Sequence, residues 1–234
     1  MVIGLPTLMG KVIPSPRIIK VAGTPHDMGK QHGEQLKSLI HEFSVNPKSR
    51  YEKIGVTGDE LNKIIDRNIE YFRKVAPDRV VELEGMAEGA KMELEELFTA
   101  HFCNEIECAQ PKLHLKDLKG YERGCTAFAA TREATIRKNT FLAMNTDASL
   151  ESMRFRVVIK AEPSKGYRYI SHSRATDNGG YGLNEKGVAI VAPTVRCKDS
   201  VEAFSAGETS GIYDRAISRT VLGDCANMDE ALDY

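Results

Sequence analysis

A cysteine and an aspartate, each attached to a short apolar run, are the residues of this chain best placed to do chemistry. Cys125 opens one run, and a second run ends in Asn145-Thr146-Asp147. Two strands joined by the charged turn between these runs would bring Cys125 and Asp147 together. A cysteine attacks as its thiolate, so it needs a nearby base or a positive environment.

Cys125 could also be a structural residue, because a free cysteine is commonly a small core residue. The chain has five cysteines in all, at an irregular spacing that is a poor disulfide framework, and none forms a Cys-x-x-Cys pair. We therefore expect neither a disulfide framework nor a bound metal or cofactor. The five are Cys103, Cys108, Cys125, Cys197 and Cys225.

Length and charge limit the classes of function that are open to the chain. Its 234 residues, 41% of them hydrophobic, can build one large domain or two small ones. A net charge of −1 argues against nucleic-acid binding, which depends on a basic surface. No apolar run approaches the ~18 residues of a membrane span, and the N-terminus does not resemble a signal peptide. We expect a soluble, cytoplasmic protein.

Apolar residues recur at helical spacing in the N-terminal half of the chain. The predicted elements are a strand at 18–21 and helices at 25–43, 59–75, 78–90 and 94–108. Gly29 and Gly33 lie four residues apart, which favours close packing of the first helix against a neighbour. The many glutamates of the last two helices are predicted to form a solvated face.

The pattern changes to short alternating runs in the C-terminal half, which is typical of antiparallel strands. Strands are predicted at 125–131, 140–145, 155–161, 167–171 and 188–192, and helices at 211–222 and from 228 onward. This order indicates an α+β fold rather than alternating βαβ units. No glycine-rich phosphate-binding loop is present in the sequence.

Two different groups could serve as the base for Cys125. His172, at the end of a predicted strand, is the best histidine candidate, although no spacing singles it out. Alternatively, cleavage of the Gly124–Cys125 bond would free the α-amine of Cys125, which has a pKa near ~8 and needs no histidine. Glycine suits such a cleavage, because it tolerates the bent backbone that lets the thiol reach the preceding carbonyl.

Three segments of the chain together resemble the isopenicillin N acyltransferase and choloylglycine hydrolase group of N-terminal-nucleophile (Ntn) hydrolases. They are 124–130, 145–147 and 182–189, and the segment 21–33 resembles the acyltransferase branch, whose members carry a helical leader before the cysteine. The resemblance implies an αββα sandwich with antiparallel sheets, preceded by that leader.

The same resemblance implies a division of the chain at the cysteine. Residues 1–124 would be the leader that becomes the small chain on cleavage. Residues 125–234 would be the start of the catalytic core, which in the family continues well beyond the position of Tyr234.

By the same resemblance, Gly124–Cys125 is the autocatalytic cleavage site and Cys125 is the nucleophile. Asp147 holds the α-amine or the substrate, and Asn145 helps to orient it. The implied activity is hydrolysis or acyl transfer at linear amide bonds through an acyl-enzyme. The implied partner is a small-molecule amide or acyl donor, including acyl-coenzyme A.

Two further residues match the family pattern less closely. The resemblance implies that the turn Asn184-Glu185-Lys186-Gly187 is a hairpin between core strands, and Asn184 could either touch the chemistry or cap this turn. Thr194 stands near the position of the family's oxyanion-hole asparagine. The chain also has Met144 or Ala143 where bile-acid-acting relatives have arginine.

Two other functions are also compatible with the sequence. The chain could be an unprocessed cysteine hydrolase that uses His172, or a non-catalytic α+β binding protein in which Cys125 belongs to the core. The acyl and amine groups of a substrate cannot be read from the residues, and a homo-oligomer is also open.

Overall fold

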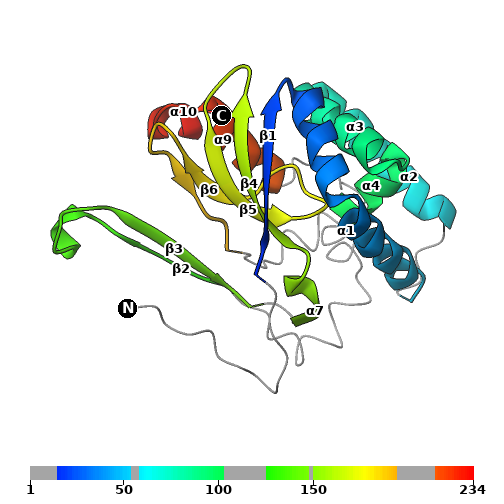
Figure 1. The fold of residues 1–234 in the computed structure, drawn as a ribbon, viewed down its shortest axis with the longest axis horizontal. Coiled ribbons are helices and arrows are strands. Elements are labelled where there is room, and N and C mark those ends of the chain that lie inside the picture. The colour runs from blue at the N-terminus through cyan, green and yellow to red at the C-terminus, as the bar shows by residue number, and fades with distance from the viewer. Residues whose placement is uncertain (1–14, 54–57, 103–124, 148–149, 194–213) are drawn as a thin grey trace.

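A computed structural model describes residues 15–53, 58–102, 125–147, 150–193 and 214–234 (Figure 1). In these residues, helices lie against one face of a five-stranded sheet, and a separate two-stranded sheet extends away from that body. The predicted α+β class is confirmed.

The four predicted N-terminal helices are confirmed. They are α1 (Pro25–Lys53), α2 (Gly58–Val75), α3 (Pro77–Ala90) and α4 (Leu94–His101). Thr24 and Asp27 form a reciprocal cap at the start of α1, since Thr24 Oγ1 accepts from the Asp27 amide and Asp27 Oδ2 accepts from the Thr24 amide. Helix α1 continues past the predicted end at residue 43, and the predicted stretch 103–108 lies outside the described residues.

The five-stranded sheet has the strand order β1-β4-β5-β6-β7. Its strands are β1 (Arg17–Gly23), β4 (Arg156–Pro163), β5 (Tyr169–Arg174), β6 (Tyr181–Asn184) and β7 (Ala189–Ile190). The prediction of antiparallel sheets is wrong for β1, which pairs with β4 in parallel. The long connection from β1 through the helical layer allows this parallel pairing, whereas β4 to β7 are joined by short antiparallel connections.

Strand β6 was not among the strands predicted from alternation, because glycines interrupt its apolar pattern, although the hairpin implied at 184–187 joins it to β7. A Cβ at Gly182 would overlap the carbonyl oxygen of Ile170 on the neighbouring strand β5, so only glycine fits this close approach. The glycine that allows this close approach thus also weakens the strand pattern in the sequence.

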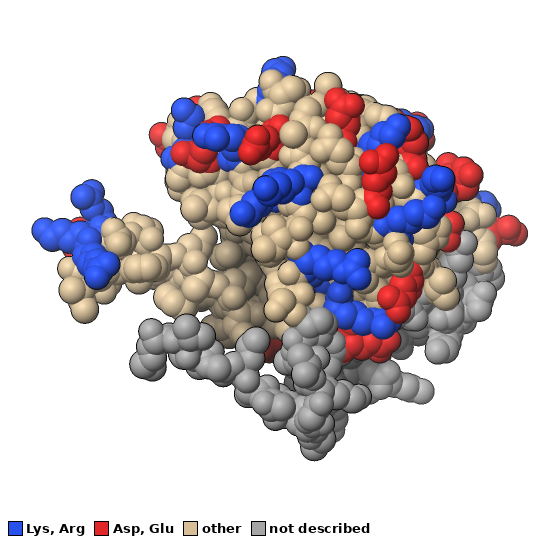
Figure 2. All heavy atoms as spheres, in the orientation of Figure 1, with Lys and Arg blue, Asp and Glu red and all other residues tan. Residues whose placement is uncertain are grey.

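The second sheet is the hairpin of β2 (Cys125–Ala130) and β3 (Phe141–Thr146), whose turn contains the short helix η1 (Arg132–Ala134). Its aromatic residues Phe128 and Phe141 are 60% and 53% exposed. Figure 2 shows basic side chains gathered at the tip of this hairpin and uncharged residues along its length. The hairpin therefore presents an apolar surface.

Among the described residues of the C-terminal half, the further α-helices are α7 (Leu150–Met153), α9 (Asp214–Asp224) and α10 (Met228–Leu232). Arg219 of α9 reaches the carboxylate of Glu82 on α3 and also lies over the ring of Tyr169 on β5. Helix α9 therefore covers the same face of the sheet as the N-terminal helices.

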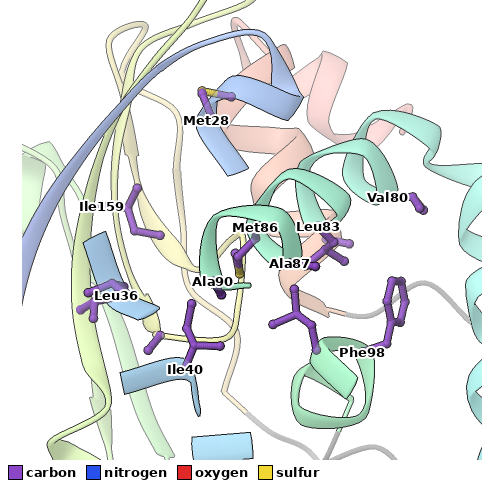
Figure 3. Packing of buried hydrophobic residues seen from close by; sticks show 14 of the residues in the cluster. Met28, Leu36, Ile40, Val80, Leu83, Met86, Ala87, Ala90, Phe98 and Ile159 are labelled. Carbon is purple, nitrogen blue, oxygen red and sulfur yellow. The ribbon is translucent and has the colours of Figure 1, made fainter. Parts of the chain in front are cut away.

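The main core lies between the helical layer and the five-stranded sheet. Figure 3 shows Met86 and Ala90 of α3 beside Ile40 of α1, with Ile159 of β4 on the sheet side. The segments 1–124 and 125–234 both contribute to this core, and β1 pairs with β4 across the predicted division. The two segments therefore share one core.

Glycines on both helices bring the backbones of α1 and α3 together. A Cβ at Gly29 or Gly33 of α1 would overlap backbone atoms of α3, and a Cβ at Gly85 or Gly89 of α3 would overlap backbone atoms of α1. The close packing predicted from Gly29 and Gly33 is confirmed.

The other face of the five-stranded sheet remains open among the described residues. Ile18, Ile170 and Leu183 expose between 43% and 63% of their surface there. Within the same residues, no helix combines the length and the apolar character needed to cross a bilayer.

Candidate functional site

The hairpin β2–β3 holds three of the predicted site residues. Cys125 is the first residue of β2 and lies opposite Thr146, while Thr126 lies opposite Asn145. The thiol is free and partly exposed, and Asn145 and Asp147 are exposed. The predicted adjacency of the two strands is confirmed, whereas Gly124 lies outside the described residues.

Asn145 holds the Asp147 carboxylate in place. Its Nδ2 donates a hydrogen bond of 2.7 Å to Asp147 Oδ1. Side chains alternate between the two faces of a strand, so Asn145 lies on the face opposite to the Cys125 thiol. The hydrogen bond therefore draws the Asp147 carboxylate toward the face that carries Asn145. The carboxylate then lies near the start of β2 but not on the side of the Cys125 thiol.

His172 lies in the other sheet. It occupies β5 between Val158 and Tyr181, and within the described residues no hydrogen bond joins it to Cys125. Loss of hydration lowers the pKa of His172, and the positive charges of Arg156 and Arg215 lower this pKa further. The imidazole is therefore neutral at neutral pH, and the described geometry assembles no cysteine–histidine pair.

Asn184 uses its side chain to hold backbone together. Its Oδ1 accepts from the amides of Lys186 and Val188 at 3.0 Å, and its Nδ2 donates to the carbonyls of Leu222 and Cys225 at 3.1 and 2.8 Å. The described contacts of Asn184 therefore favour turn capping over a role in chemistry. Thr194 lies outside the described residues.

A buried charge cluster around Asp177 was missed by the sequence reasoning. Arg174 donates to both carboxylate oxygens of Asp177 at 2.8 and 3.0 Å, and Arg215 Nε lies 3.2 Å from Oδ2. His101 Nδ1 lies 3.4 Å from Oδ1. Burial alone would raise the pKa of Asp177, but the two arginines and His101 hold it well below its usual range.

A second buried cluster surrounds Glu82. The side chains of Arg79 and Arg219 each approach its carboxylate to 3.2 Å, and Glu82 is only 3% exposed. The prediction that the acidic face of this helix is solvated is thus wrong for Glu82, because α9 covers it. The three-residue spacings Arg79–Glu82 and Arg174–Asp177 were the local sequence signals for these clusters, and they give no hint of Arg215 or Arg219.

The sequence was compared with protein-family models and with curated proteins, and no match was found. A functional assignment therefore rests on the residues and on their geometry.

Proposed function

We propose that this chain is a self-processing N-terminal-cysteine amidohydrolase or acyltransferase, similar to the isopenicillin N acyltransferase and choloylglycine hydrolase group. The observation that carries the proposal is the position of the Asn145–Asp147 pair at the start of β2. A carboxylate on the face opposite to the thiol suits the backbone nitrogen of Cys125, which can be approached from either face. A carboxylate can stabilise this nitrogen as a charged ammonium group only after cleavage has turned it into an amine.

In the proposed maturation, the Cys125 thiol attacks the carbonyl carbon of Gly124. The C–N bond breaks as the C–S bond forms, and the nitrogen takes up the thiol proton to become the α-amine. Water then hydrolyses the thioester and releases the segment 1–124 with a carboxyl terminus. Until that step, the chain is a precursor with latent chemistry.

In the proposed turnover, the α-amine of Cys125 accepts the thiol proton, and the thiolate attacks the carbonyl of a linear amide. The substrate amine leaves with that proton, and an acyl-thioester remains on Cys125. Water or another amine then takes the acyl group. Asp147 stabilises the ammonium form of the α-amine, and Asn145 keeps the carboxylate in position.

The αββα sandwich belongs to the same proposal. Two described surfaces support it: the open face of the five-stranded sheet, which exposes Ile18, Ile170 and Leu183 among charged residues, and the exposed aromatic residues of the hairpin β2–β3. Apolar sheet faces are stable when another layer covers them. A cytoplasmic location also belongs to the proposal, because an odd number of irregularly spaced cysteines suits a reducing compartment.

The first test is self-cleavage of the purified chain. Intact-mass measurement over a long incubation is expected to show two fragments that break after Gly124, and the Cys125→Ala variant is expected to remain whole. The fragments should elute together in native size exclusion and separate only in denaturant, because β1 and β4 pair across the break and the core is shared.

The control for this test is Cys225→Ala, which removes a buried thiol elsewhere and should leave cleavage intact. Persistence of the whole chain, with amide hydrolysis that survives Cys125→Ala, would sink the proposal. Loss of thiol-dependent activity on changing His172, with Asp147 dispensable, would instead support the unprocessed cysteine–histidine hydrolase.

A further inference from the structure

A group of basic side chains lies at one end of the open sheet face. Arg156 of β4 is paired with Arg174 of β5, and two residues further along the same face Val158 is paired with His172. His172 is in turn paired with Tyr181 of β6. The guanidinium of Arg215, in the first turn of α9, lies over the Tyr181 ring at 4.9 Å from its centroid.

The acidic groups near these side chains are already engaged. Asp177 is shared by Arg174 and Arg215, and Asp214 accepts a hydrogen bond of 2.9 Å from the Tyr181 hydroxyl. Within the described part of the chain, Arg156 has no hydrogen bond or ion pair to a carboxylate. The one buried carboxylate of Asp177 is therefore already bound by two guanidinium groups, and Arg156 is left without a carboxylate partner among the described residues.

Arg156 is held in an environment that disfavours its charge. Its side chain is half-buried, and this burial lowers its pKa, as does repulsion by Arg215 and Arg174. Arg174 and Arg215 are themselves almost fully buried and bound to Asp177, so they cannot move away to relieve that repulsion. An anion beside Arg156 would supply the missing negative charge.

We propose that Arg156, flanked by Arg215 and His172, binds the oxyanion of a small molecule, either a carboxylate or a phosphate. The planar guanidinium donates two parallel hydrogen bonds to such groups, and partial burial strengthens the attraction. The exposed side chain of His172 leaves the site open to solvent. This binding site does not depend on the chemistry proposed for Cys125.

The test is thermal unfolding of the full chain in inorganic phosphate, in acetate and in chloride at equal ionic strength. At about tenfold above Kd, the bound anion is expected to raise Tm by about 3 °C over chloride. A response to phosphate alone identifies a phosphate site, and a response to acetate alone identifies a carboxylate site. Arg156→Gln should lose the shift, and Arg156→Lys should retain only part of it.

The matched control is Lys160→Gln, which removes one positive charge from the same face of the same strand and should keep the full shift. General stabilisation by phosphate acts equally on all variants, so the difference between them isolates the site. Without added anion, Arg156→Gln should melt no lower than the unaltered chain, because it relieves repulsion. Equal shifts in the unaltered chain and in Arg156→Gln, or no shift in either anion, would overturn the proposal.

Discussion

Gly29→Ala is expected to lower the free energy of unfolding by about 3 kcal/mol, near the upper end of overpacking costs. The new methyl group would overlap the carbonyl oxygen of Glu82 and crowd the amide of Met86. Both are backbone atoms, which cannot rotate away, so α1 must move off α3 and loosen the core between them. The change also gains up to about 1 kcal/mol of helix propensity, and we expect the steric overlap to outweigh this gain.

The measurement is urea unfolding followed by circular dichroism, with Gly58→Ala as the matched control. Gly58 begins α2, and a Cβ there would meet no atom within 4 Å. Gly58→Ala should therefore be neutral or slightly stabilising. If both variants unfold at the same urea concentration, the close packing of α1 against α3 does not contribute to stability.

Asp177→Asn is expected to cost about 3–5 kcal/mol of stability at pH 7, because it removes one partner of a buried ion pair. Arg174 and Arg215 would remain 5% and 6% exposed, with no carboxylate between them. Asparagine has nearly the same shape, so the loss comes from charge rather than from a cavity. Urea unfolding at pH 7 measures it.

The pH dependence gives a second readout for Asp177. Its pKa in the folded protein lies below the value of about 3.9 in the unfolded chain. Between these two pKa values the unfolded chain binds a proton that the folded chain does not, so stability falls as pH falls through this window. The difference between the unaltered chain and Asp177→Asn should therefore be largest at neutral pH and shrink below about pH 4.

Glu185→Gln is the control for Asp177→Asn, since it breaks a charge pair with Arg168 at the protein surface. Solvent and salt screen that pair, so only a small change is expected. Equal stability of Asp177→Asn and the unaltered chain at pH 7 would show that the buried cluster adds nothing to stability.

Most of the regular elements could be predicted because their signals are local. Helical spacing of apolar residues identified α1 to α4, and alternation identified the hairpin β2–β3 with Cys125 and Asn145 on adjacent strands. A hairpin joins neighbouring segments, so its pairing needs no knowledge of the rest of the fold. The glycine spacing of α1 likewise predicted a close helix contact.

The sequence by itself thus determined the α+β class, the helices and the pairing that brings Asp147 to the start of β2. Only the tertiary structure decided that β1 runs parallel to β4, that Glu82 is buried beneath α9, and that Arg174 and Arg215 share Asp177. These contacts join residues far apart along the chain. The energies of these contacts depend on burial and on neighbouring charges, and the spacing of residues along the sequence indicates neither of them.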